Sequence, residues 1–385
     1  MIWRLAFQVI PVLAWALTVM AAVRPAKLGR MKALLVSLVL AVAFAKFGIF
    51  AVFGGNSFNP SLPRAVILAC GFAYGAAMLF AAAVSAAALF DALAALAGRP
   101  VGLAAKRVRS AALAVAAVAL SAYGMYEGAC IPSVRRVEVA MKGLPAAFDG
   151  YRIVHMSDLH CSTATLRGRF ERIAERVNAL DADLIAITGD FVDGRTSSRA
   201  GDLAPLASLR ARDGVVACSG NHEAYWDWSS WLPALQGMGM VFPEETGPVV
   251  VRRGSAALAI GGLPDPALGE FDRAMSRGGV SGCFSGAPEG AFRILLFHRP
   301  LTDAVGSSSP KAGVSLQLSG HTHGGAMPVL SLLVAHVNEG RTRGLYRFAP
   351  DGFIHVSPGT GQWAGFPLRL FNPAEITEVV LRRGK

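Results

Sequence analysis

Four long apolar segments in the first third of the chain limit what it can fold into. They run approximately over residues 5–23, 33–53, 65–90 and 111–129, and each is close to the roughly 20 residues that a helix needs to cross a bilayer. The chain of 385 residues is 53% hydrophobic and only 16% charged, which is more apolar than an ordinary soluble protein. Four membrane-spanning helices are therefore predicted. The first is interpreted as a span and not as a cleaved signal peptide, because its apolar run is long and further spans follow.

The basic residues in the connecting loops predict the orientation of these helices. Loops 24–32 and 99–109 contain four Lys or Arg residues each, whereas loop 54–64 contains one. Because basic loops remain preferentially in the cytoplasm, both chain ends and everything after residue 130 are expected on the opposite side. Three basic residues shortly after that point weigh against this orientation: Arg135, Arg136 and Lys142.

Two charged residues lie in or at the ends of the predicted spans. Lys46 is expected to extend its long side chain to the outer interface, and Asp91 to lie near the inner one. Gly71 and Gly75 form a G-x-x-x-G pattern, which indicates close helix packing. No inverted repeat or glycine-broken pair of helices marks a transport path, so residues 1–130 are interpreted as a four-helix transmembrane anchor.

The net charge of +11 raises the question of an anionic partner. The chain has no Lys/Arg block interleaved with aromatic residues of the kind that nucleic-acid binding requires. A lipid bilayer is therefore the expected partner, and nucleic acid is not. The five cysteines form no C-x-x-C pair and predict neither a disulfide framework nor a zinc ribbon.

After the apolar third, the pattern changes to short strands and amphipathic helices. Residues 131–148, with Pro132 and Pro145, are interpreted as a juxtamembrane linker that opens into a short strand, and residues 149–385 as a second domain. Buried strands are predicted at residues 151–156, 184–188, 215–219, 249–252, 256–261, 292–297, 314–318, 352–356 and 375–381. Helical spacing separates the first three strands, at residues 165–180 and 202–210.

The order of these elements predicts the fold class. Alternating strands and helices favour a sheet of parallel strands joined by right-handed crossovers. The later part has more strands than helices, which indicates a second, mixed sheet packed on the first. The expected fold is an α-helical transmembrane region followed by an α/β domain with two packed mixed β-sheets flanked by helices, an α/β/β/α sandwich.

Polar residues follow several of these strands, at the points where the strands give way to turns. Five short blocks are involved: Asp158-Leu159-His160, Gly189-Asp190, Gly220-Asn221-His222-Glu223, His298 and Ser319-Gly320-His321-Thr322-His323-Gly324-Gly325. Ligand sites in such sheets lie at the carboxyl ends of the strands, so the blocks are expected to converge. Glycines on both sides of the last two histidines allow the backbone to turn both rings into one space.

The side chains of these blocks predict a metal site. Seven of them offer carboxylate, amide or imidazole ligands and none offers a thiolate: Asp158, His160, Asp190, Asn221, His298, His321 and His323. Such a set suits divalent ions such as Mn, Fe, Zn or Co, without deciding among them. Seven ligands are too many for one tetrahedral ion and suit two ions that share a bridging carboxylate. Such a pair lowers the pKa of a water and neutralises a phosphoryl group.

Two further residues are candidates for catalysis. His222 follows Asn221 directly and can donate a proton to a leaving oxygen, an effect worth about 10² to 10⁴ in rate. Asp193 is expected to hold His222 in one tautomer, with a turn-stabilising role as the alternative. The remaining histidines after residue 149 are expected to be ordinary structural residues: His155, His336 and His355.

Taken together, the five blocks resemble the calcineurin-like metallophosphoesterase superfamily. They match its pattern D-x-H, G-D, G-N-H-[DE], H and G-H-x-H over roughly residues 150–325. The sequences S-D-L-H and S-G-H-T-H-G-G, with the stretch from Pro367 to Glu375, resemble the membrane-anchored bacterial branch of that family.

The resemblance implies a role for each candidate residue. It implies that one metal is held by Asp158, His160, Asp190 and His323. It implies that the other is held by Asp190, Asn221, His298 and His321, so that Asp190 bridges the two. His222 would then be the leaving-group histidine of the family and Asp193 its partner. Arg195 is not assigned the phosphate-binding role known in some members, because Gly194 separates it from Asp193.

The expected function is that of a membrane-tethered dinuclear-metal phosphoesterase. It would hydrolyse a phosphomonoester, phosphodiester or pyrophosphate bond of a phosphorylated small molecule or a lipid by attack of a metal-bridging hydroxide. The expected location is the bacterial plasma (inner) membrane, as a multi-pass protein with an extracytoplasmic catalytic domain. Three alternatives remain open: a metal-dependent nuclease, a non-catalytic membrane scaffold or sensor with a structural metal site, and a transporter with an accessory phosphoesterase.

Overall fold

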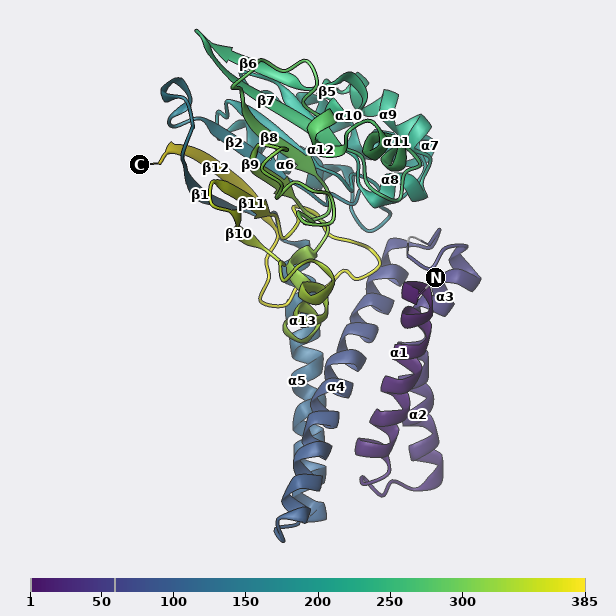
Figure 1. The fold of residues 1–385 in the computed structure, drawn as a ribbon. Helices are drawn as coiled ribbons and strands as arrows, with labels where there is room; N and C mark the ends of the chain where they lie inside the picture. Colours follow the sequence, from purple (N-terminus) through teal and green to yellow (C-terminus); the bar gives the residue numbers. More distant parts are fainter. Residues whose placement is uncertain (1, 59, 385) are drawn as a thin grey trace. The chain divides into compact units, whose positions relative to one another are not determined.

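The structure, a computed structural model, describes residues 2–58 and 60–384. The chain divides into two compact units (Figure 1). The helical unit comprises Met1–Ala129 and Ala364–Leu370, and the α/β unit comprises Cys130–Trp363 and Phe371–Lys385. The short segment Ala364–Leu370 therefore packs with the helices, although it was expected within the second domain.

The helical unit contains the apolar segments of the first third. Its elements are α1 (Ile2–Thr18), a π-helical turn η1 (Val19–Val23), α2 (Arg30–Phe44), α3 (Lys46–Gly54), α4 (Arg64–Leu96) and α5 (Leu103–Ala129). Within the described residues, α4 and α5 are long and apolar enough to cross a membrane, whereas α2 and α3 qualify only as a pair bent by 63°. The first segment gives a shorter apolar helix. Two helices of the described residues, or three spans if the bent pair is counted as one, thus have the properties of a span, and the four spans stay a prediction.

Lys46 lies at the bend between α2 and α3 and differs from the expectation. Its side chain is buried and its ammonium group donates a hydrogen bond to the carbonyl oxygen of Gly365 at 2.5 Å. The same ammonium group lies 4.9 Å from the ring centre of Phe47 and 5.0 Å from that of Phe50. The ammonium group of Lys46 is thus not exposed to solvent, because a carbonyl group 319 residues away and two aromatic rings take the place of water.

Asp91 is paired within the same helical unit. Its carboxylate lies 2.5 Å from the guanidinium group of Arg109 and 3.5 Å from the ammonium group of Lys106, both on α5. This pairing accounts for a carboxylate in an apolar helix without a chemical role.

The G-x-x-x-G pattern of α4 marks a close contact, as expected. A Cβ atom at Gly71 would lie 2.6 Å from Pro367, and one at Gly75 would lie 2.6 Å from Leu368 and 2.8 Å from Ser121 of α5. The two glycines therefore allow α4 to pack both on α5 and on the segment Ala364–Leu370.

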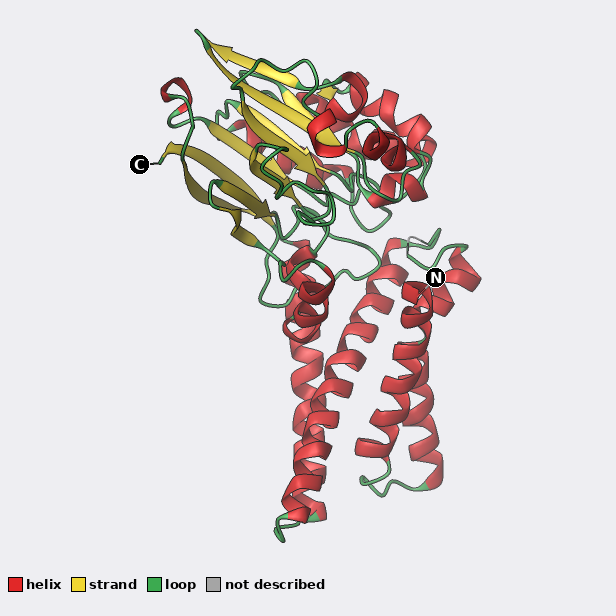
Figure 2. Ribbon diagram, in the orientation of Figure 1, coloured by secondary structure: helices red, strands yellow, loops and turns green. Residues whose placement is uncertain are grey.

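The α/β unit contains the strands and the shorter helices (Figure 2). Its strands are β1 (Ser133–Met141), β2 (Arg152–Met156), β3 (Leu184–Thr188), β4 (Val215–Cys218), β5 (Met240–Val241), β6 (Val249–Arg253), β7 (Ala256–Leu263), β8 (Phe292–Phe297), β9 (Val314–Ser319), β10 (Gly344–Ala349), β11 (Gly352–Val356) and β12 (Glu375–Arg383). Its helices are η2 (Ala146–Phe148), α6 (Arg167–Asn178), α7 (Thr196–Leu203), η3 (Ala204–Ser208), α8 (Asn221–Tyr225), α9 (Trp228–Gly237), α10 (Pro243–Thr246), α11 (Glu270–Ser276), α12 (Gly279–Gly282), η4 (His323–Gly325) and α13 (Pro328–Val337).

The strands form two mixed sheets of six strands each. The first has the order β1-β12-β2-β3-β4-β5, in which only the pair β12–β2 is antiparallel. The second has the order β10-β11-β9-β8-β7-β6, with antiparallel pairs at its two edges and parallel pairs between them. The mixed character predicted for the second sheet is confirmed.

Apolar side chains on both faces of the first sheet explain the layers. Along β3, Leu184 and Ala186 belong to a core shared with the second sheet, whereas Ile185 and Ile187 belong to a core covered by α6, α7 and α9. Successive side chains of a strand point to opposite faces, so β3 is buried on both sides. A third core lies on the outer face of the second sheet, under α11 and α12. The α/β/β/α sandwich expected from the sequence is confirmed.

Two elements differ from the sequence-based expectation. Residues 131–148, expected as a linker that opens into a short strand, contain the nine-residue strand β1, which pairs with β12 from Ser133↔Glu375 to Met141↔Arg383. The exposed arginines of this edge strand made it resemble a linker. The predicted helix 202–210 has wrong bounds, because α7 ends at Leu203 and a 3-10 turn containing Pro205 follows. Proline has no N–H group with which to continue an α-helix.

Candidate metal centre

The predicted ligands lie in turns that directly follow strands of both sheets. The turns after β2, β3 and β4 of the first sheet carry Asp158, His160, Asp190 and Asn221. The turns after β8 and β9 of the second sheet carry His298, His321 and His323. Because the carboxyl ends of parallel strands meet at one edge of a sheet, the two sets of turns can face one another.

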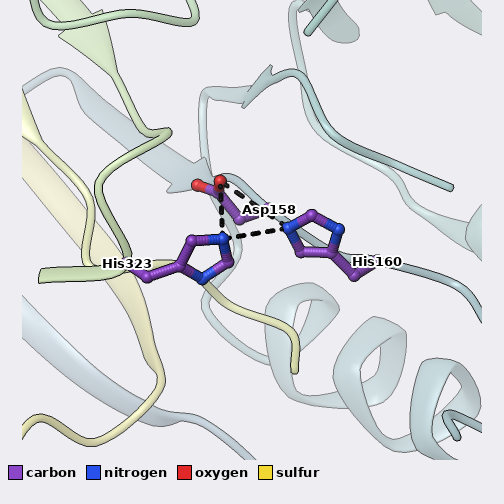
Figure 3. Close-up of side chains that lie close together, drawn as sticks. All are labelled: Asp158, His160 and His323. Atoms are coloured by element: carbon purple, nitrogen blue, oxygen red, sulfur yellow. Dashed lines mark hydrogen bonds and ion pairs between the residues drawn. The ribbon is translucent and has the colours of Figure 1, made fainter. Parts of the chain in front are cut away.

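A first cluster consists of Asp158, His160 and His323 (Figure 3). One carboxylate oxygen of Asp158 lies 3.9 Å from Nε2 of His160 and 3.6 Å from Nε2 of His323. The two Nε2 atoms are themselves 3.1 Å apart. Two of these side chains, those of His160 and His323, come from positions 163 residues apart in the chain, and all three point into one space (Figure 3).

A second cluster consists of Asp190, His298 and His321. Nε2 of His298 lies 3.2 Å from Oδ2 of Asp190 and 3.2 Å from Nδ1 of His321. The other ring nitrogen of His298 contacts the carbonyl oxygen of Thr188 at 2.7 Å. A carbonyl oxygen can only accept, so Nδ1 of His298 carries a proton, and in the neutral ring Nε2 is left as an acceptor within the cluster.

Asp190 lies between the two clusters. Its Oδ2 atom is 3.2 Å from Nε2 of His298 in the second cluster and 3.8 Å from Nε2 of His160 in the first. Its Oδ1 atom accepts a hydrogen bond of 2.8 Å from the backbone N–H of His222. One carboxylate therefore reaches both clusters.

The donor atoms of both clusters fit a pair of divalent cations. Ring nitrogens of His160 and His323 lie 3.1 Å apart, and those of His298 and His321 lie 3.2 Å apart. Two acceptor nitrogens at this distance repel each other unless a proton or a cation lies between them. The buried Oδ1 atom of Asn221 has no hydrogen-bond partner among the described residues, although buried acceptors are normally satisfied. Carboxylate, amide and imidazole donors together suit Mn, Fe, Zn or Co.

Five of the seven predicted ligands have a left-handed backbone conformation. The φ angles are 54° at Asp158, 47° at His160, 54° at Asp190, 70° at His321 and 48° at His323. Such angles are uncommon outside glycine, and each costs about 1 to 3 kcal/mol unless the surroundings hold it. The fold therefore holds these turns in strained conformations that direct the side chains toward the clusters.

Two glycines are required by the close approach of the turns. A Cβ atom at Gly320 would lie 1.8 Å from Oγ of Ser157 and 2.4 Å from Oδ2 of Asp158. A Cβ atom at Gly220 would lie 2.3 Å from Oδ1 of Asp190. No larger residue fits at either position without displacing a candidate ligand.

His222 and Asp193 contact each other beside the clusters. Oδ1 of Asp193 lies 2.5 Å from Nδ1 of His222, and Oδ2 lies 3.1 Å from Nδ1 of His160. Burial lowers the pKa of His222, but the carboxylates of Asp190 and Asp193 raise it to about 9. Burial raises the pKa of Asp193, but His222 and His160 lower it to about 2. Asp193 thus orients two histidines, whereas the sequence indicated only His222.

Glu223 is a site residue whose role the sequence analysis missed. It is fully buried, and its two carboxylate oxygens accept four backbone hydrogen bonds. The donors are the N–H groups of Asp190, Phe191, Val192 and Gly220, at 3.0, 2.7, 3.3 and 2.7 Å. Glu223 therefore fastens the turn of Asp190 to the turn of Asn221. The acidic residue of the G-N-H-[DE] block was the available signal.

Two further residues lie near the first cluster. The ring centre of Trp363 lies 6.2 Å from that of His323, 6.4 Å from that of His160 and 5.9 Å from that of His222. Asn372 donates a hydrogen bond to the carbonyl oxygen of His323. Trp363 thus forms an aromatic wall at the first cluster, and Asn372 holds the turn of His323.

The other histidines lie outside both clusters, as expected. His155 and His355 are buried between the sheets, with their Nδ1 atoms 3.0 Å apart, and Nε2 of His155 contacts the Thr188 hydroxyl at 2.9 Å. His336 is exposed on α13.

Comparison with known proteins gives the family. Residues 151–325 match the family model of calcineurin-like phosphoesterases. The chain is 33% identical over 284 residues to the "Transmembrane protein with metallophosphoesterase domain" of Danio rerio, covering 71% of this chain and 62% of the relative. It is 31% identical over 297 residues to the Bos taurus protein of the same name, covering 74% and 66%. The chain thus spans just under two thirds of the length of these two relatives.

A bacterial relative is covered over nearly its whole length. The uncharacterized metallophosphoesterase YkuE of Bacillus subtilis is 29% identical over 287 residues, which cover 70% of this chain and 94% of the relative. Residues 151–325 therefore form a calcineurin-like metallophosphoesterase domain.

Proposed function

We propose that the chain is a membrane-tethered phosphoesterase with a dinuclear metal centre. It would hydrolyse a phosphomonoester, phosphodiester or pyrophosphate bond of a soluble or lipid-linked substrate. The observation that carries this proposal is the position of Asp190, whose Oδ2 atom lies within 3.8 Å of a ring nitrogen from each cluster. A carboxylate in that position can bind two cations at once, whereas a single cation in one cluster would not require it to reach the other cluster.

The two clusters support the following assignment of the ligands. Asp158, His160 and His323 would hold one cation, and Asn221, His298 and His321 the other, with Asp190 shared by both. When bound, two divalent cations supply positive charge that neutralises a phosphoryl group and lowers the pKa of a water molecule.

His222 is proposed to protonate the leaving oxygen. Its Nδ1 atom is held by Asp193 at 2.5 Å, so that Nε2 is left to face the clusters, 3.8 Å from Oδ2 of Asp190. The two carboxylates favour the protonated ring, which is the form that can donate. A positioned general acid contributes about 10² to 10⁴ in rate.

The membrane tether is proposed from the helical unit. α4 and α5 have the length and composition of spans, and two relatives are named as transmembrane proteins. The distribution of Lys and Arg in the loops of the first third supports an extracytoplasmic α/β unit. A protease-protection assay tests this orientation. When the protease is added to the extracytoplasmic side of sealed membranes, the α/β unit is expected to be cleaved, whereas the opposite orientation would protect it.

The test of the function combines metal content with turnover. Full-length protein in detergent, loaded with Mn(II), is expected to hold two ions and to hydrolyse an aryl phosphate monoester or diester. Asp190→Ala is expected to lose metal from both positions, whereas His222→Ala is expected to keep its metal and lose turnover by roughly 10² to 10⁴. The control is His336→Ala, which removes an exposed histidine of the same unit.

Three results would contradict the proposal. Equal metal loss in the Asp190 and His222 variants would show that the two roles were wrongly divided. Two bound metals without turnover of either ester would favour a structural metal site. Faster cleavage of single-stranded DNA than of a lipid diphosphate would favour a nuclease.

A further inference from the structure

An ion pair of Arg299 and Asp265 lies beside the second cluster and takes no part in the proposed reaction. Arg299 directly follows His298 at the end of β8, and Asp265 follows the end of β7. β7 and β8 are parallel neighbours, paired as far as Leu263↔Phe297. The two side chains therefore leave the same edge of the second sheet as the ligands His298 and His321.

Asp265 holds the guanidinium group of Arg299 in one orientation. Nε of Arg299 donates to Oδ2 of Asp265 at 2.8 Å, and Nη2 donates to Oδ1 at 2.8 Å. Asp265 is 0% exposed, and its Oδ1 atom also accepts a hydrogen bond of 2.8 Å from the backbone N–H of Ala267. Such a bidentate ion pair fixes both the position and the plane of the guanidinium group.

The pair is not needed to hold the turn in which Arg299 lies. The carbonyl oxygen of Arg299 already accepts hydrogen bonds from the hydroxyl of Ser319 at 3.3 Å and from the amide of Gln317 at 3.5 Å. Burying a carboxylate such as Asp265 to pair with an arginine carries a desolvation penalty that often exceeds the gain in stability. A role in presenting the arginine explains the arrangement better than a role in stabilising the fold.

One edge of the guanidinium group remains available. Nε and Nη2 are occupied by Asp265, and no acceptor among the described residues contacts Nη1. The side chain of Arg299 is 28% exposed. Two N–H donors on a fixed cation thus face an accessible space.

Arg299 directly follows His298 in the chain, so this space adjoins the second cluster. Tyr225 is 62% exposed, and its ring centre lies 5.4 Å from that of His222. The first cluster is bordered instead by the aromatic ring of Trp363. The two sides of the site therefore differ: one is cationic and the other aromatic.

We propose that Arg299, presented by Asp265, binds a second phosphoryl group of the substrate, which makes diphosphates the preferred substrate class. This inference rests on the proposed function. The reacting phosphorus would lie at the two clusters and the leaving phosphate on the side of His222 and Arg299. The oxygen of water forms a bond to the reacting phosphorus and releases one proton to the solvent, and the bond from that phosphorus to the bridging oxygen breaks. The leaving phosphate keeps the electron pair and takes a proton from His222.

The test compares two substrates that differ by one phosphoryl group. Full-length protein with Mn(II) is assayed on hexyl diphosphate and on hexyl monophosphate. In Arg299→Gln, the ratio of kcat/KM for the diphosphate to that for the monophosphate is expected to fall by about tenfold to a hundredfold, the value of one or two charge-assisted hydrogen bonds. The loss is expected in KM more than in kcat, and Arg299→Lys, which keeps the charge, is expected to recover part of it.

The matched control is Arg293→Gln. Arg293 is a half-buried arginine near the start of β8, six positions before Arg299 in the chain, and its Nη1 atom donates to the carbonyl oxygen of Ala312. This variant is expected to leave the substrate ratio unchanged. Asp265→Asn is expected to raise KM for the diphosphate in the same direction as Arg299→Gln, because Asp265 positions the arginine. A metal content equal to that of wild type in all four variants shows that the clusters are intact.

The outcomes separate this inference from the proposed function. An equal loss on both substrates in Arg299→Gln, or no change in the ratio, would overturn the diphosphate subsite while the phosphoesterase stands. If the wild type hydrolyses neither substrate, the proposed function fails, and calorimetry with inorganic pyrophosphate and inorganic phosphate decides the subsite. Tighter binding of pyrophosphate that is lost in Arg299→Gln would support it, and equal binding would refute it.

Discussion

Glu223→Gln is expected to separate the two turns that hold Asp190 and Asn221. The carboxylate of Glu223 accepts four backbone hydrogen bonds, two at each oxygen. Oε1 accepts from the N–H groups of Phe191 and Val192 at 2.7 and 3.3 Å. Oε2 accepts from those of Asp190 and Gly220 at 3.0 and 2.7 Å. The substitution keeps the size of the side chain and changes one acceptor into a donor.

The cost follows from the number of donors that lose their acceptor. The amide oxygen of a glutamine can replace only one carboxylate oxygen, so two buried N–H groups would face an NH2 group in either orientation. Each unsatisfied buried donor costs about 1 to 3 kcal/mol, which gives about 2 to 6 kcal/mol in total. This is a large part of the roughly 5 to 15 kcal/mol that stabilises a folded domain.

Thermal unfolding of the full-length protein in detergent, followed by tryptophan fluorescence, measures this loss. At about 2 to 4 °C per kcal/mol for a domain of this size, the Tm of Glu223→Gln is expected to fall by about 4 to 24 °C, together with its metal content. The control is Glu245→Gln, because Glu245 is an exposed glutamate on α10. A Glu223→Gln protein with the Tm and the metal content of wild type would refute the role assigned to Glu223.

Two further predictions concern other buried contacts. Gly320→Ala places a methyl group 1.8 Å from Oγ of Ser157, so this variant is expected to lose metal and about 1 to 3 kcal/mol of stability; an unchanged metal content and Tm would contradict this. Burial lowers the pKa of His355 to about 3 and holds that of His155 well below its usual value. An unfolded histidine takes up a proton near pH 6.5, so the free energy of unfolding is expected to fall as the pH drops below about 6.5. The free energy of unfolding is measured by denaturation at about pH 7 and about pH 5. Its change per pH unit is expected to be smaller than in wild type by up to about 1.4 kcal/mol in His355→Gln, but not in His336→Gln. Equal slopes in the two variants would refute this.

The buried strands could be predicted from the sequence alone. Leu184–Thr188, Phe292–Phe297 and Gly352–Val356 lie where they were expected. Strands buried on both faces are short runs of apolar residues that end at turn residues, and this pattern is local. Edge strands lack it because one side meets solvent, which is why β10 was missed and β1 was expected only as a short strand at the end of a linker.

Contacts between residues far apart in the chain could not be predicted. Lys46 has the sequence pattern of an interfacial lysine, but its acceptor is a carbonyl group 319 residues away. Glu223 was visible as part of a motif, but three of its four donors lie 31 to 33 residues away, in another turn. Arg299 was an ordinary charged residue until Asp265, 34 residues away, was found to hold it.

The sequence by itself determined which residue types stand at the ends of the strands, because strands and turns depend on neighbouring residues. Only the tertiary structure decided how these residues are grouped, since the grouping depends on the order of strands in two sheets. It brings His323 to His160 across 163 positions of the chain, and it places Asp190 within reach of both clusters. The left-handed turns that direct these side chains are likewise tertiary, because isolated Asp and His residues seldom adopt them and only the surrounding contacts hold them there.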